Sequence, residues 1–185
     1  MIVMIDVEIH GLDELEAKLN KLPSVLAEGA MNGQEDAIEQ AEAYAVDELQ
    51  SSIKYSQGEL ARSFKHEVKQ DGDEIVARWW NSSMVAIFRE FGTGKAGENS
   101  LKKLPSNIAI AYRQTPWYIP AEEVDIDLNK IYGIPKIKIK GKYFYRTTGQ
   151  PARQFMTPAM DKLAKEAPNI IKTRVEQEFR NKLGD

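Results

Sequence analysis

The chain has 185 residues, and its 25 Lys and Arg against 28 Asp and Glu leave a formal net charge of −3, so whole-molecule attraction to nucleic acid or anionic membranes is not expected. The absence of cysteine excludes disulfides, thiolate nucleophiles and Cys-based zinc or iron–sulfur sites. With 42% hydrophobic residues, the composition predicts one folded globular domain over residues 1–185.

The N-terminus is predicted to form a strand and then a short helix. Residues 2–9 alternate between apolar and charged side chains, which is the pattern of a half-buried strand. Leucines then recur at helical spacing, and Pro23 is expected to end the helix that they mark. These are Leu12, Leu15, Leu19 and Leu22. We expect no membrane span, because no run of about 18 apolar residues occurs. We also expect no N-terminal leader, because residues 1–10 contain no basic run followed by a long apolar stretch.

A long helix is predicted next. From Ser24, a suitable N-cap, apolar residues mark one stripe over about eight turns to Ile53, so we expect a helix roughly 45 Å long. Gly29 and Gly33 each lower helix stability by about 1 kcal/mol relative to Ala. They mark the place where this helix could bend or break.

The middle of the chain is predicted to form a hairpin. Residues 64–68 and 75–80 have strand character and flank the turn residues Asp71, Gly72 and Asp73. The short apolar segment Met84–Phe91 follows, bounded by a glycine, and its length and composition fit either a helical turn or a third strand. The sequence alone leaves those two alternatives open.

Residues 95–150 are interpreted as an ordered insertion. Glycines and prolines break this stretch too often for long helices, yet it is too rich in Tyr, Trp and Ile for a disordered linker. Ile137, Ile139 and residues 143–145 flank Gly141, which predicts a second hairpin within the insertion.

A C-terminal helix completes the expected fold. Thr157 and Pro158 form a good N-cap and first-turn pair, and apolar residues continue at helical spacing toward the C-terminus. The elements together predict an α+β protein, with a small antiparallel sheet packed against the long N-terminal-half helix and the C-terminal helix. The strand-and-loop insertion extends that domain.

Three glycines form a G-x-G-x-x-G pattern, which raises the question of a dinucleotide site. They are Gly92, Gly94 and Gly97. Such a site follows a core strand and opens a helix within a βαβ unit, so that helix N–H groups meet the pyrophosphate. Here the residues after Gly97 are polar and are soon interrupted by Pro105. A glycine-rich turn is therefore favoured strongly, and we expect no cofactor.

Catalytic and metal-binding residues are sparse. His10 and His66 are the two histidines, and neither has a second ligand at metal-binding spacing. Glu122 and Glu123 could in principle act as an acid–base pair, but the neighbouring Asp125 and Asp127 favour a solvated acidic loop. We therefore expect no enzyme, no metal site and no small-molecule substrate.

Four alternating lysines are a candidate DNA contact. They alternate with Ile137, Ile139 and Gly141, which places four ammonium groups on one strand face, where they could neutralise phosphates. The alternative is an edge strand protected from aggregation by its lysines, and we favour it because no arginine cluster reinforces the patch. The lysines are Lys136, Lys138, Lys140 and Lys142.

Four aromatic residues are candidates for a subunit interface. Trp79 and Trp80 are adjacent, so in a strand one ring points inward and the other outward. The outward ring, together with Trp117 and Tyr118 of the insertion, is more aromatic surface than a monomer usually exposes. Ordinary core packing of these rings is the competing interpretation.

Four motifs stand out in chain order: Gly11-Leu12-Asp13-Glu14-Leu15, residues 58–64, Glu90-Phe91-Gly92-Thr93-Gly94, and Gly149-Gln150-Pro151-Ala152-Arg153 leading into Phe155-Met156-Thr157-Pro158-Ala159-Met160. In this order they resemble a family of phage proteins described as tail components, minor capsid, neck or tail-completion proteins and typified by the tenth gene product of phage HK-ninety-seven. The resemblance spans nearly the whole chain. Residues 117–120 are similar to an insertion of some members, whereas Arg89 and Glu59 depart from the usual pattern.

The resemblance implies a non-enzymatic structural protein of a tailed bacteriophage or prophage. Its members form a homo-oligomeric ring around the DNA channel of the head–tail connector, between adaptor or head-closure proteins and the tail terminator. The expected location is the virion neck, after synthesis in the bacterial cytoplasm. The lysines of residues 136–142 would then contact DNA in the lumen or a neighbouring subunit. The alternative function is a nucleic-acid-binding module that uses the same lysines.

Overall fold

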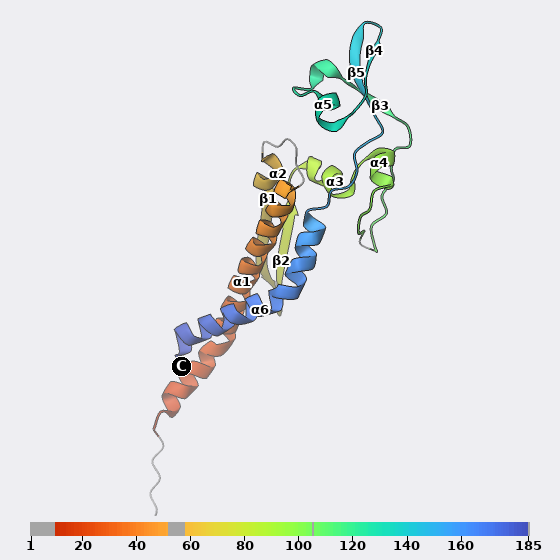
Figure 1. The fold of residues 1–185 in the computed structure, drawn as a ribbon. Helices are drawn as coiled ribbons and strands as arrows, with labels where there is room; N and C mark the ends of the chain where they lie inside the picture. The colour runs from red at the N-terminus through yellow and green to blue at the C-terminus, as the bar shows by residue number, and fades with distance from the viewer. Residues whose placement is uncertain (1–9, 52–57, 105, 185) are drawn as a thin grey trace, which may run out of the picture. The chain divides into compact units, whose positions relative to one another are not determined.

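The computed structural model describes residues 10–51, 58–104 and 106–184, and the predicted strand at residues 2–9 lies outside them. Helices and antiparallel sheets are mixed, so the predicted α+β class is confirmed. In chain order the elements are α1 (Leu12–Ser51), α2 (Glu59–Arg62), β1 (Phe64–Asp71), β2 (Glu74–Asn81), α3 (Met84–Phe91), α4 (Gly94–Glu98), β3 (Trp117–Pro120), the short 3-10 helix η1 (Ala121–Glu123), α5 (Leu128–Tyr132), β4 (Lys136–Ile139), β5 (Lys142–Thr147) and α6 (Met156–Leu183) (Figure 1).

The chain divides into two compact units. The first contains the described residues up to Glu39, His66–Arg78 and the described residues from Ala164 onward. The second contains the described parts of residues 40–65 and 79–163. Helices α1 and α6 and the hairpin β1–β2 contribute residues to both units.

Helix α1 is one element from Leu12 to Ser51, so the prediction that Pro23 ends a first helix is wrong. Ser24, predicted to be an N-cap, lies inside the helix, where its hydroxyl donates a hydrogen bond to the carbonyl of Lys21 at 2.8 Å. The proline removes one backbone donor. Because Val25 is buried two residues later, packing beyond the proline offsets that loss and the helix continues.

Gly29 and Gly33 allow α1 and α6 to approach closely within the first unit. A Cβ added at Gly29 would lie 2.9 Å from the Cα of Val175, and one at Gly33 would lie 2.8 Å from the Cα of Ile171. Both glycines lie inside the continuous helix, so the break considered from the sequence is not seen. Their low helix propensity is offset by contacts that a larger residue would prevent.

Replacing Gly33 by Ala should destabilise the first unit, although Ala favours helix by about 1 kcal/mol. We expect a net loss of about 1–2 kcal/mol, because the added methyl group meets backbone of α6 that has to move. Thermal unfolding followed by circular dichroism measures this change. The control Asn20→Ala changes an exposed position of the same helix and should be neutral or slightly stabilising. An equal gain from both substitutions would contradict the close approach.

The hairpin β1–β2 confirms the prediction made from the turn residues. Gly72 lies in its turn with a positive φ of 61°. Within the first unit the hairpin is tied to α1, because Gln34 Nε2 donates to the carbonyl of Ile75 at 3.4 Å. His66 Nε2 lies 2.8 Å from Glu35 Oε1. This histidine therefore joins a strand to a helix.

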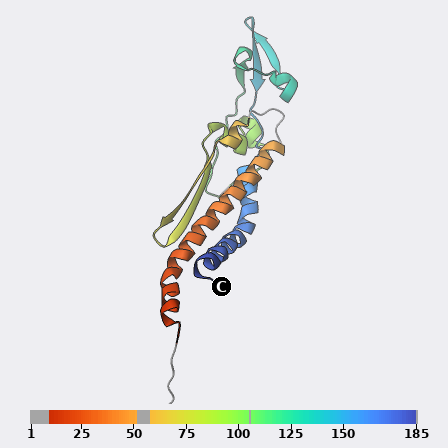
Figure 2. The same ribbon diagram turned by 90° about the vertical axis from the view of Figure 1, so that its left-hand side faces the viewer.

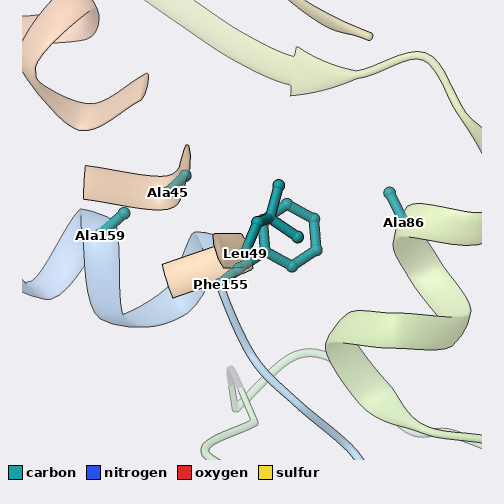
Figure 3. Close-up of a cluster of buried hydrophobic side chains, with 5 residues drawn as sticks. All are labelled: Ala45, Leu49, Ala86, Phe155 and Ala159. Atoms are coloured by element: carbon teal, nitrogen blue, oxygen red, sulfur yellow. The ribbon is translucent and has the colours of Figure 1, made fainter. Parts of the chain in front are cut away.

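The core of the second unit lies where α1, α3 and α6 meet. Leu49 and Phe155 lie at its centre, and small side chains surround them, so the backbones approach closely (Figure 3). The Phe64 ring extends the core, since its centroid lies 5.0 Å from that of Trp79 and 6.0 Å from that of Phe155. The fully or nearly buried members are Ala45, Leu49, Ala86, Phe155 and Ala159.

The insertion carries its own sheet, with strand order β3-β5-β4. Its strands β4 and β5 are drawn in teal and cyan in Figure 2. The predicted second hairpin is thus confirmed as β4–β5, and a third strand, β3, pairs with its other side. The side chain of Asp127 begins α5 by accepting from the backbone N–H groups of Asn129 and Lys130 at 3.0 and 3.3 Å. These hydrogen bonds, that of Lys130 first, lower the pKa of the Asp127 carboxyl below its ordinary value.

Candidate assembly interface

The segment that the sequence left undecided, Met84–Phe91, is the helix α3. It begins because the Ser83 hydroxyl accepts a hydrogen bond from the N–H of Val85 at 3.3 Å, and it ends at Gly92, whose φ is 76°. Ala86 and Glu90 are buried, and they mark the side of the helix that packs against the rest of the second unit.

The other side of α3 is apolar and exposed to solvent. Its four side chains expose 68, 51, 55 and 45% of their surface, and we call them the α3 face: Met84, Val85, Ile87 and Phe88. A solvent-facing helix side is normally polar, because exposed apolar area is unfavourable in water. Contiguous apolar area of this kind usually marks a surface that another molecule covers.

An open hollow of about 520 Å³ adjoins the α3 face, and Ile87 belongs to both. Its walls are mainly apolar and come from β2, α3 and α6. At its rim the Lys103 ammonium group pairs with Asp161, with 2.5 Å between Nζ and Oδ1. The principal apolar residues of the wall are Trp79, Trp80, Ile87, Phe91, Met156 and Met160.

Glu90 anchors α3 to the beginning of α6. Its side chain is only 5% exposed, and its carboxylate accepts from the backbone N–H groups of Phe155, Met156 and Thr157 at 2.8, 3.0 and 2.9 Å. The Thr157 hydroxyl donates to the same carboxylate at 2.5 Å. The prediction that Thr157 caps this helix is therefore wrong, since α6 begins at Met156 and Glu90 satisfies its first N–H groups from α3.

The G-x-G-x-x-G pattern is a tight backbone contact rather than the opening of a long helix. An added Cβ at Gly92 would lie 2.6 Å from the Cα of Gly97, and one at Gly94 would lie 2.3 Å from the carbonyl oxygen of Thr148. One at Gly149 would lie 1.8 Å from the carbonyl oxygen of Thr93. We call this set the glycine joint: Gly92, Gly94, Gly97 and Gly149.

Hydrogen bonds join the two backbone segments that meet at the glycine joint. Thr93 N–H donates to the carbonyl of Gln150 at 2.9 Å, and Gln150 N–H donates to the Thr93 hydroxyl at 3.1 Å. Beside the joint, Arg153 N–H donates to the Arg89 carbonyl at 2.8 Å. The space that a pyrophosphate would need next to these glycines is thus occupied by residues 148–152 of the same chain.

The four aromatic candidates lie at different places in the second unit. Trp79 stacks on Phe64 in the core, whereas Trp80 is 41% exposed at the hollow, as the strand alternation predicted. Trp117 lies against the glycine joint, and the Arg113 guanidinium is 5.3 Å from its ring centroid. Tyr118 is exposed on β3. Only Trp80 therefore combines an exposed ring with the hollow.

The prediction that four lysines share one strand face is wrong. Strand β4 contains Lys136 and Lys138 and ends at residue 139, while Lys142 begins β5. Lys140 lies in the turn between them with a φ of 48°, next to Gly141 with a φ of 87°. Two consecutive residues in the left-handed region reverse the chain, so the continuous lysine face is interrupted.

Three of these lysines already have partners. The ammonium groups of Lys136 and Lys138 each lie 5.5 Å from the centroid of the Tyr143 ring. Lys142, on the opposite face, pairs with Glu122 at 3.0 Å. The observed strand order places β4 at an edge of its sheet, which fits the edge-strand interpretation.

In the part of the chain that the structure describes, no three His, Asp or Glu side chains gather into a potential metal site. Among the same residues, no helix has the length and apolarity needed to cross a membrane.

Sequence reasoning missed the α3 face, although a signal was present. Residues 84–88 are five apolar side chains in a row. On a helix such a run covers more than one side, so part of it has to face solvent or a partner. Choosing between helix and strand was the step that the sequence did not resolve.

The chain matches no protein-family model, and neither a curated protein nor a solved structure is significantly similar to it.

Proposed function

We propose that the chain is a structural protein of the virion of a tailed phage or prophage, and that copies of it form a ring in the neck that joins head to tail. The α3 face carries this proposal. Four adjacent exposed apolar residues beside an open hollow have the chemistry of a protein–protein interface, where apolar anchors supply most of the binding energy. In a ring, each subunit offers two different faces to its neighbours.

The family resemblance supports the same proposal through the roles of its motifs. Glu90 caps α6, and Gly92, Gly94 and Gly149 bring two backbone segments together. These are roles in shaping the fold, and they fit a family whose members assemble with one another rather than catalyse a reaction.

The other proposed partners follow from a place in the neck. They are adaptor or head-closure proteins on the head side, the tail terminator on the tail side, and DNA in the channel through non-specific phosphate contacts. Lys138 and Lys140, at and beside the β4–β5 turn, are the residues we propose for the DNA contact or for a contact with a neighbouring subunit.

One observation favours a nucleic-acid-binding module as the second candidate. Lys136 and Lys138 lie beside the exposed ring of Tyr143, and a cationic surface with an aromatic ring suits phosphates and bases. Such a module would bind DNA as a monomer, with an affinity that falls steeply as salt is added.

The substitution Ile87→Lys tests the ring. It places a charge in the middle of the α3 face at a position that is 55% exposed, so the fold should be retained while self-association weakens by about tenfold or more. Light scattering measures the mass of the assemblies against the 20.9 kDa of one chain, and electron microscopy shows whether they are rings.

Ile108→Lys is the matched control, because it makes the same change at an exposed isoleucine outside α3. It should leave the assemblies unchanged. The wild-type protein could instead stay monomeric at every concentration and bind DNA in a salt-sensitive manner. That result would contradict the ring and favour the second candidate.

A further inference from the structure

The first turns of α1 carry a second exposed apolar surface, which belongs to the first unit. Its leucines recur at intervals of three, four and seven residues, so they lie along one side of the helix. Their exposed fractions are 56, 53, 56 and 42%, and we call them the leucine stripe: Leu12, Leu15, Leu19 and Leu26.

Among the described residues, little covers these turns. Between residues 12 and 24, only Lys18 and Leu22 are half-buried, and the other side chains are exposed. Isolated helical segments of about this length are marginal in water, and most helices in proteins are stabilised by packing of an apolar side. The leucine stripe is the apolar side that such packing would use.

The charges beside the leucine stripe are complementary to those around the α3 face. Residues 12–26, which contain the stripe, have three carboxylates and two cations, and all three carboxylates lie within residues 13–16. These residues are Asp13, Glu14, Glu16, Lys18 and Lys21. Residues 84–104 and 150–162 contribute six cations and three carboxylates, one of them the buried Glu90. The cations are Arg89, Lys95, Lys102, Lys103, Arg153 and Lys162. Lys103 is paired with Asp161 and Lys162 with Glu48, so the excess of positive charge comes from the other four.

Arg89 lies on α3 itself. Its partial burial, with the nearby Arg153, lowers the pKa of its guanidinium below the ordinary value. An arginine remains charged at neutral pH even so. A cation thus stays beside the α3 face when the surrounding apolar surface is covered.

We propose that the leucine stripe of one subunit docks on the α3 face and hollow of the next copy of this chain. This inference rests on the proposed ring. An apolar row on a helix fits a hydrophobic groove in a common mode of helix recognition. Because every subunit has one stripe and one α3 face, a single kind of head-to-tail contact covers both surfaces in a closed ring.

The absence of cysteine makes this contact testable by cross-linking. Leu19→Cys and Ile87→Cys each place one thiol on an exposed position of one of the two surfaces. The two variants are co-expressed with different tags and treated with a short bismaleimide. Linked heterodimers should exceed the linked homodimers of either variant alone by on the order of tenfold, because docking holds the two thiols at a high effective concentration.

The double variant, with both cysteines in one chain, should give a ladder of linked oligomers. Leu19→Cys paired with Ile108→Cys is the control, and it should give only the background level of linked dimer. Circular dichroism of each variant verifies that the fold is kept.

Strong linkage of Leu19→Cys to itself would mean that leucine stripes pair with each other, and linkage of Ile87→Cys to itself would mean that α3 faces pair. Either result overturns the inference. Oligomers seen by light scattering without any linkage between the two thiols overturn it as well, while leaving the proposed ring intact. If the protein forms no oligomers, both this inference and the proposed ring are wrong.

Discussion

Replacing Glu90 by Ala should lower the free energy of unfolding of the second unit by about 3 kcal/mol or more. Three backbone N–H groups at the start of α6 lose a charged acceptor, and each such hydrogen bond contributes on the order of 1.5–3 kcal/mol when it is buried. The truncated side chain also leaves a void behind α3. Urea unfolding followed by tryptophan fluorescence measures the change in this unit, because Trp79, Trp80 and Trp117 all belong to it.

Two further variants separate the cap from a general effect of losing a carboxylate. Glu90→Gln keeps the shape of the side chain and one acceptor oxygen, but its amide NH₂ group points toward backbone N–H donors. The decrease in the free energy of unfolding should therefore be intermediate. Glu123→Ala removes an exposed carboxylate and should stay within about 0.5 kcal/mol of the wild type. Equal effects of Glu90→Ala and Glu123→Ala would show that Glu90 does not cap α6.

Replacing Gly149 by Ala should be of similar severity for a different reason. The residue has a φ of 105°, in the region that favours glycine, and an added Cβ would lie 1.8 Å from the carbonyl oxygen of Thr93. The unfavourable φ contributes about 1–2 kcal/mol and the displacement of backbone about 1–3 kcal/mol more. Because the clash is with backbone rather than with a flexible side chain, we expect the joint to open. The same fluorescence-detected unfolding reports the loss.

Gly141→Ala is the matched control for this experiment. Gly141 also has a positive φ, 87°, but nothing lies within 4 Å of its added Cβ. Only the conformational penalty of about 1–2 kcal/mol should remain, and it should be confined to the β4–β5 turn. If both variants lost equal stability, the clash at the glycine joint would play no part.

Features that depend on neighbouring residues could be predicted from the sequence. The hairpins around Gly72 and Gly141 were predicted because each joins strand-forming residues through a turn that a glycine permits. The greater exposure of Trp80 than of Trp79 fits the alternation of side chains along β2. In each case the deciding interactions lie within a few positions along the chain.

Features that depend on distant residues could not be predicted in the same way. Thr157 looked like an N-cap, yet the cap of α6 comes from Glu90, far away in the sequence. Pro23 looked like the end of a helix, but packing of Val25 beyond it carries α1 onward. A local preference of a few kcal/mol is overridden when burial elsewhere contributes more.

The amino-acid sequence by itself determined the α+β class, both hairpins and the absence of thiol chemistry, because composition and periodicity record which sides of local elements face solvent. Only the tertiary structure decided that Glu90 caps α6, that the glycines serve close backbone contact and that one side of α3 stays exposed. The physical reason is that hydrogen bonds and steric contacts act over a few ångströms of space. Residues that lie far apart along the chain meet only once it has folded.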